Sequence, residues 1–148
     1  MTQPAKQFSV YQVDRPGVLS QVCDALAREK VNLVALSMMD SNEHGVLRLV
    51  AESETRARAA LARLNLPMST HDVLLAELPN RPGSLADICG RLGAEHVAIH
   101  YAYCTGGSPQ GRTLAVLRVS DLPKALKILD AKKTRHRETA TVRPRGRR

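Results

Sequence analysis

The apolar residues of this chain recur with two periods, and each period predicts a different element. Val18, Val22 and Leu26 recur at every fourth position, which indicates an amphipathic helix. Short apolar runs bounded by turn residues, such as 8–13 before that helix and 31–39 after it, indicate strands. The first half of the chain is predicted to contain strands at 8–13, 31–39, 46–51 and 68–72, with helices beginning near Val18 and after Ser53.

The second half of the chain repeats this order of elements. Gly93 follows a helical pattern and is suited to end it, and Asp121 precedes another and is suited to cap it. The predicted strands of this half are 73–78, 97–104, 113–120 and 138–142, and its helices are 84–92 and 122–130. Each half has the order β-α-β-β-α-β, which predicts an α+β, ferredoxin-like unit of four antiparallel strands with both helices on one face.

A four-residue phrase marks the junction of the first strand and the first helix in both halves. It reads Asp14-Arg15-Pro16-Gly17 in the first half and Asn80-Arg81-Pro82-Gly83 in the second, an offset of 66 residues. The same offset relates Leu19, Cys23, Leu26, Glu29 and Val31 to Leu85, Cys89, Leu92, Glu95 and Val97. A repeat of this length indicates a duplicated small domain, because most solenoid repeats are shorter.

The duplication predicts the domain organisation. We expect one unit at 1–71, a second at 72–142 and a basic tail at 143–148. The offset grows to 70 after a Gly- and Pro-rich stretch at 105–111, which we interpret as a longer hairpin loop. Units of this size bury only about 60% of their unfolded surface, so we expect the two to pack against each other.

The repeated phrase has the chemistry of an anion site as well as that of a turn. Proline suits the first turn of a helix, and glycine lets the backbone approach a ligand. The helix N-terminus that follows has free N–H groups and the positive end of the helix dipole, which suits the carboxylate of an amino acid. A turn without a ligand would explain a single copy, and the recurrence of the phrase favours the binding interpretation.

The net charge of +8 is concentrated at the end of the chain. Residues 1–130 carry 14 Lys and Arg against 13 Asp and Glu, whereas residues 131–148 carry 8 Lys and Arg against one Glu. A basic tail of this kind binds nucleic acid through counterion release, or is simply solvated. It contains no aromatic residue on which a base could stack, which favours the second interpretation.

Other classes of site have weaker support in the sequence. The three cysteines lack the Cys-x-x-Cys or Cys/His spacing of a zinc site, so we interpret them as reduced thiols and expect no metal or other cofactor. No nucleophile–base pair, carboxylate pair or phosphate-binding loop is readable, so we do not expect an enzyme. The short polar N-terminus and the lack of a long apolar run predict a cytoplasmic protein without a membrane segment.

Two sets of polar side chains lie in the middle of predicted strands. Arg48 and Arg118 hold matching positions in the two halves, where they face solvent on the open sheet or meet another chain. His100 lies beside Tyr101 and Tyr103 in the second strand of the second half. A side chain there either selects a ligand or packs across an interface.

Both halves resemble ACT domains, the small βαββαβ modules that bind amino acids and other small ligands and regulate metabolic enzymes. The resemblance rests on 14–19 and 80–85, which contain the repeated phrase, and on Val31-Asn32-Leu33 and Val97-Ala98-Ile99. It covers about residues 6–142 and points to the stand-alone tandem ACT proteins of bacteria, which carry no catalytic domain.

The resemblance implies a geometry for the ligand. ACT units commonly pair through their second strands into one eight-stranded sheet, and ligands lie at that seam, between the loop of one unit and the second strand of the other. The expected partner is therefore an amino acid, with a second copy of the chain or a regulated enzyme beyond it. The implied ligand-binding residues are Asp14, Arg15, Pro16, Gly17, Val18, Leu19, Asn32, Leu33, Asn80, Arg81, Pro82, Gly83, Ser84, Leu85, Ile99 and His100.

Carried onto this chain, the resemblance implies two unequal sites. One joins the Asn80 loop to Asn32, and an amide can accept from an ammonium group or donate to a carboxylate. The other joins the Asp14 loop to Ala98, where the strand amide is missing and Asp14 would repel a carboxylate. We expect the first site to bind an amino acid better, unless Asn32 only satisfies neighbouring backbone and Asn80 only holds the turn.

These observations favour a regulatory protein that senses an amino acid at the seam between two units. The same order of elements occurs in RNA-recognition domains, which stack bases on aromatic residues of their central strands. The third strands of this chain, 46–51 and 113–120, contain no aromatic residue. Nucleic-acid binding through the basic tail is therefore the alternative function.

Overall fold

The structure is a computed structural model that describes residues 1–12, 16–39, 45–106 and 111–139, with side chains up to residue 131. Its elements follow in the order β1 Thr2–Gln12, α1 Val18–Arg28, β2 Leu33–Met39, β3 Gly45–Ala51, α2 Glu54–Ala62, β4 Met68–Pro79, α3 Ser84–Ala94, β5 Ile99–Cys104, β6 Arg112–Val119 and α4 Leu122–Thr139. None of the helices in these residues has the length and apolar character needed to span a membrane.

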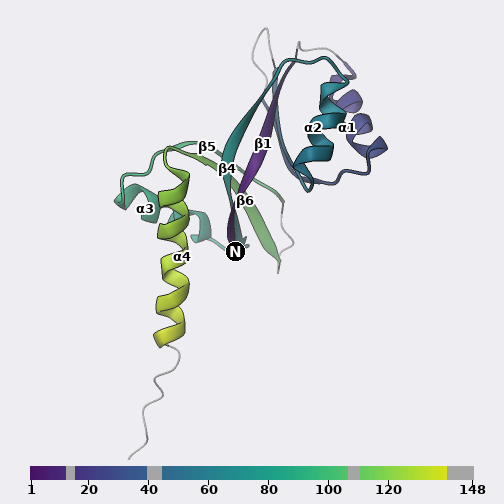
Figure 1. The fold of residues 1–148 in the computed structure, drawn as a ribbon. Helices are drawn as coiled ribbons and strands as arrows, with labels where there is room; N and C mark the ends of the chain where they lie inside the picture. Colours follow the sequence, from purple (N-terminus) through teal and green to yellow (C-terminus); the bar gives the residue numbers. More distant parts are fainter. Residues whose placement is uncertain (13–15, 40–44, 107–110, 140–148) are drawn as a thin grey trace, which may run out of the picture.

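The strands form one antiparallel sheet in the order β2-β3-β1-β4-β6-β5. The two long strands β1 and β4 lie side by side at its centre, with the remaining strands of each repeat on their own side (Figure 1). The α+β prediction of two paired ferredoxin-like units is confirmed. The expected boundary between residues 71 and 72 lies inside β4, which runs unbroken from one unit into the next.

The pairing of β1 with β4 obeys the symmetry of the sequence repeat. Thr2 pairs with Ala76, and the offset of 66 converts these residues into Met68 and Val10, which also pair. Lys6 pairs with Asp72, its own repeat equivalent, so the local twofold axis passes through this pair. The Lys6 Nζ atom lies 2.6 Å from Asp72 Oδ1, an ion pair at the junction of the two repeats.

The structure corrects three of the predicted strands. The runs 68–72 and 73–78 form the single strand β4, and Glu138 and Thr139, predicted to begin the last strand, belong to α4. Residues 140–142, the rest of that predicted strand, lie outside the described residues. The register places Thr2–Lys6 against Asp72–Ala76, the position that a fourth strand of the second repeat would take. The helix can therefore continue past Asp130, because the edge of β4 is already paired.

All four helices cover the same face of the sheet. Side chains alternate between faces along a strand. The even-numbered Phe8 and Val10 of β1 pack into the core beneath α1 and α2, while the even-numbered Thr2 donates from Oγ1 to Asp130 Oδ1 of α4 at 2.5 Å. The two helix pairs lie at opposite ends of the molecule because β1 and β4 are long enough to serve both (Figure 1).

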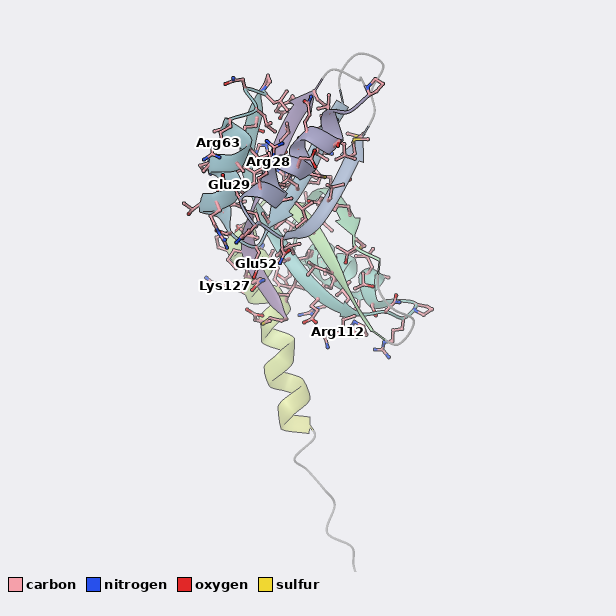
Figure 2. All side chains as sticks on the ribbon, turned by 90° about the vertical axis from the view of Figure 1, so that its right-hand side faces the viewer. Arg28, Glu29, Glu52, Arg63, Arg112 and Lys127 are labelled. Carbon is pink, nitrogen blue, oxygen red and sulfur yellow. The ribbon has the colours of Figure 1, made fainter. Side chains whose placement is uncertain are left out.

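Each repeat has a separate apolar core between its helices and the sheet. Leu26 of α1 and its repeat equivalent Leu92 of α3 are the centres of these cores, at 1% and 0% exposure. At the surface, Arg63, which follows α2 directly, donates to Glu29, which follows α1 directly, and Figure 2 shows this pair well apart from Arg112.

The face without helices, which we call the inner face, curls on itself. Tyr101 and Tyr103 of β5 reach across to β1: Gln7 Nε2 donates to the Tyr101 hydroxyl at 2.6 Å, and the Tyr103 hydroxyl donates to Gln7 Oε1 at 3.0 Å. Gln7 is fully buried as a result. A third apolar cluster lies on this face and contains Ala35, Val50, Val73, Leu75 and Val116.

Candidate functional site

The two copies of the repeated phrase form the same turn where the structure describes them. Gly17 and Gly83 precede their helices with φ of +92° and +88°, a left-handed conformation that favours glycine. Each carbonyl accepts the first helical hydrogen bond, from Gln21 N at 3.0 Å and from Asp87 N at 2.9 Å. The predicted junction of strand, turn and helix is confirmed. Asp14 and Arg15 lie outside the described residues.

The second turn borders a cleft of about 670 Å³. The loop contributes Arg81, Pro82, Gly83 and Ser84, and the start of β1 contributes Met1 and Thr2. The buried residues Leu78, Ile88 and Leu129 form its apolar wall. Both repeats therefore contribute to the cleft, and the first repeat does so through the beginning of the chain.

Charged groups of both signs surround this cleft. Glu77 is the acidic centre: its carboxylate lies 2.8 Å from Arg112 Nε and 3.6 Å from the N-terminal ammonium of Met1. Asp87 lies 3.9 Å from Arg91 on the first two turns of α3. Arg81 is exposed, and within the described part of the chain its side chain has no ion-pair partner.

The polar groups at the start of α3 are only partly satisfied. The first N–H groups of a helix have no acceptor within the helix and point out of its N-terminus. The Ser84 hydroxyl is buried and has no hydrogen-bond partner among the described residues, although Ser84 lines the cleft. The Ser84 N–H itself donates to the Arg81 carbonyl at 3.3 Å. An unsatisfied hydroxyl at the positive end of a helix dipole suits an anionic group of a ligand.

The remaining predicted site residues lie elsewhere. Asn32 is exposed beside the start of β2 and donates from Nδ2 to Glu52 Oε2 at 3.2 Å, and it is not among the residues that line the cleft. Leu33 is 38% exposed on β2. Ile99 packs against the second core, whereas His100 is exposed on β5. Of the hydrophobic residues after the turns, Val18 is buried, Leu19 packs against the first core and Leu85 is 39% exposed.

The seam implied by the second strands is not formed within the chain. β2 and β5 are the outermost strands of the sheet, and the repeats join through β1 and β4 instead. The expected eight-stranded sheet is accordingly a sheet of six strands in the described residues. The physical reason is that Thr2–Lys6 pairs with the free edge of β4, so the two repeats share their central strands.

Sequence reasoning missed the contribution of the chain start to the cleft. Met1 and Thr2 precede the first apolar run, which begins at Phe8, and no alternation marks them as strand. Glu77 and Arg112 were also missed, because a charged residue at the end of a strand is common. These residues reach the cleft because β1 pairs with β4, and that pairing joins residues far apart in the sequence, so no local pattern indicates it.

Comparison with known proteins gives a consistent result. The family described as an ACT domain pair matches residues 1–139. A solved protein from Bacteroides thetaiotaomicron is 32% identical with a TM-score of 0.81, over 89% of this chain and 90% of that one. The ligand-free regulatory subunit of aspartate kinase from Thermus thermophilus has the same fold, with 12% identity and a TM-score of 0.64 over 88% of this chain and 95% of its own. No curated protein sequence gives a significant match.

Proposed function

Because the chain belongs to the ACT domain pair family, we propose that it is a regulatory protein that binds an amino acid in the cleft at the start of α3. The observation that carries this proposal is the buried, unpartnered Ser84 hydroxyl at a helix N-terminus that lines a cleft of about 670 Å³. The volume is within the range of small-molecule sites, about 300–1,000 Å³.

The charges around the cleft suit a ligand that carries both signs. A carboxylate placed at the start of α3 meets the helix dipole, the Ser84 hydroxyl and the Arg81 guanidinium. The ammonium group of the same molecule can reach the acidic side of the cleft, where Glu77 and Asp87 lie. The apolar wall of Leu78, Ile88 and Leu129 is left for the side chain of the amino acid.

The proposal favours the second turn over the first, as the sequence does. Asn80 stands where the first turn has Asp14, and a carboxylate beside the ligand's carboxylate would be repulsive. The predicted contact between the Asn80 loop and Asn32 stays a prediction. The described position of Asn32, bonded to Glu52, gives no support to it.

A regulatory role without catalysis accompanies this proposal, with a metabolic enzyme as the natural target. The three cysteines are free thiols, which supports action in a reducing compartment such as the cytoplasm. The alternative of nucleic-acid binding depends on the basic tail at 143–148, which lies outside the described residues.

A thermal-shift screen of the amino acids tests the proposal. A ligand at 100 times its Kd adds about 2.7 kcal/mol of stability, so at least one amino acid should raise the Tm clearly. Arg81→Gln should weaken that ligand at least about tenfold, because a hydrogen bond to a charged group contributes roughly 1.5–3 kcal/mol.

Two matched variants act as controls for this screen. Arg15→Gln makes the same change in the first copy of the phrase, and Asn32→Ala tests the contact predicted from sequence. Arg15→Gln should bind the ligand as the unmodified chain does. Weaker binding by Asn32→Ala would support the contact predicted from sequence, and unchanged binding would contradict that contact. Equal weakening by Arg15→Gln and Arg81→Gln, or no shift with any amino acid, would contradict the proposed site.

A further inference from the structure

Two arginines occupy matching positions on the inner face of the sheet. Arg48 of β3 and Arg118 of β6 are equivalent in the two repeats, within the runs Val46-Leu47-Arg48-Leu49 and Val116-Leu117-Arg118-Val119. Arg48 is opposite the buried Ser9 of β1, and Arg118 is opposite Tyr101 of β5. Directly opposite residues share a face of a sheet, so both arginines lie on the face that carries no helix.

The curl of the sheet brings these two positions together. The guanidinium carbon of Arg48 lies 4.3 Å from the ring centroid of Tyr101, although β3 and β5 are separated by three strands in the sheet order. Tyr101 is at the same time the neighbour of Arg118 in the β5–β6 register. One aromatic ring is therefore flanked by an arginine from each repeat.

His71 lies on the inner face of β4, and β4 lies between β3, which carries Arg48, and β6, which carries Arg118. Burial lowers the pKa of His71, and the charges of Arg118 and Arg48 lower it further, so both guanidinium groups act on the imidazole. Its Nε2 atom lies 3.0 Å from Ser69 Oγ, which in turn lies 3.0 Å from the Tyr11 hydroxyl. This row of hydroxyl groups fixes the ring in place beside the arginines.

The cluster has no counter-charge in the described part of the chain. Neither arginine has an ion pair with a described carboxylate. Glu77, an acid on the same face of β4, is already bound to Arg112 at 2.8 Å. Asp72 is adjacent to His71 in sequence, but it points to the opposite face and pairs with Lys6 at 2.6 Å.

We propose that Arg48, Arg118 and His71 form a second binding site, for a small molecule with a phosphate or carboxylate group. Like charges that are half-buried without a counter-ion raise the free energy of the folded chain, and an anion between them removes this cost. Planar guanidinium groups bind either oxyanion in a bidentate manner. All three side chains are half-buried, which favours a small molecule over a macromolecular surface.

This site is independent of the cleft at α3. It shares no residue with that cleft. The two proposals can therefore fail separately. A ligand that occupies both sites would give two independent binding events. Arg81→Gln would weaken one of them, and Arg48→Gln would weaken the other.

Calorimetric titration at constant ionic strength tests this proposal on the full chain. The probes are inorganic phosphate and succinate, with chloride replaced so that the salt concentration does not change. We expect saturable binding of at least one probe, weakened at least about tenfold by Arg48→Gln and by Arg118→Gln. Arg56→Gln is the matched control, since Arg56 is exposed on α2 and carries the same charge.

An NMR titration of His71 gives a second test, which uses the unmodified chain and therefore does not depend on whether a variant folds. A bound anion offsets the charges of Arg118 and Arg48, so the pKa of His71 should rise when the probe is present. The carboxylate of Asp72 also raises this pKa, but it does so equally in the presence and absence of the probe. Preference for phosphate or for succinate identifies the class of anion. An unchanged His71 titration, or equal affinity in Arg48→Gln and Arg56→Gln, would overturn the proposal.

Discussion

The two repeats differ in the strand that completes them, although they share the same turn and the same helices. The first repeat is completed by the chain that follows it, because the start of β4 pairs with β1 from Val10–Met68 to Lys6–Asp72. The second repeat is completed by the start of the chain, because Thr2–Lys6 lies along the later part of β4. The difference shows that a duplicated unit can share its central strands with its copy.

The second strands of the two repeats have also diverged. On the inner face, β2 carries Ala35 and Ser37, whereas the repeat-equivalent positions of β5 carry Tyr101 and Tyr103. The small side chain of Ala35 packs into an apolar cluster, and the tyrosines reach across the sheet to the buried Gln7. The apolar cluster therefore draws residues from both repeats, whereas the second strand of the second repeat contributes the side chains that reach across the inner face.

The largest expected effect follows from removing residues 2–5, the part of β1 that pairs with the later part of β4 and so completes the second repeat. The edge of β4 would lose its partner, and we expect a loss of about 3–5 kcal/mol in unfolding free energy, since each backbone hydrogen bond contributes about 1 kcal/mol. Hydrogen exchange should increase more in β6 and α3 than in β3 and α1. Equal protection of the two repeats after truncation would contradict the shared-strand account.

A smaller loss is expected from matched changes in the two cores. Leu26→Ala and Leu92→Ala each remove a fully buried leucine from an equivalent position, and each should cost about 2–5 kcal/mol. Because β1 and β4 serve both repeats, chemical denaturation of either variant should remain a single transition. Two separate transitions would show that the repeats unfold independently.

The smallest expected effect concerns the dependence of stability on pH. The pKa of His71 in the folded chain is lowered from its usual 6.5, so the unfolded chain binds the proton more tightly. The resulting stability is fully present above pH 6.5 and is lost as the pH falls towards the lowered value. Denaturant titrations should show a weaker pH dependence in His71→Gln, with His100→Gln on the exposed side of β5 as the control. The same change of unfolding free energy with pH in both variants would contradict this prediction.

The local features of the fold could be predicted from the sequence. Gly17 and Gly83 each precede an amphipathic helix, as the repeated phrase predicts, and both are found in the left-handed conformation. The predicted cap at Asp121 is also confirmed, because its Oδ1 accepts from Lys124 N at 2.9 Å. These features depend on neighbouring residues, so local chemistry determines them.

The features that join the repeats could not be predicted in this way. Gln3, Pro4 and Lys6 show no strand periodicity, and their strand structure depends on the unpaired edge of β4. Likewise, nothing in the neighbourhood of Arg48 indicates that Tyr101 lies 4.3 Å from it, because the curl of the whole sheet brings them together. The loop that the sequence singled out borders the cleft, and the residues at the start of β1 that line the cleft with it were not predicted.

The most direct test of the account is amide chemical-shift mapping with the amino acid that stabilises the chain most. We predict saturable shifts at Arg81, Gly83 and Ser84 and at Thr2 across the cleft, with the equivalent Gly17 turn unchanged. Shifts of similar size at Gly17 and Gly83, or shifts near Asn32 with none at the start of α3, would contradict the proposal that the second turn and the start of the chain form the ligand site.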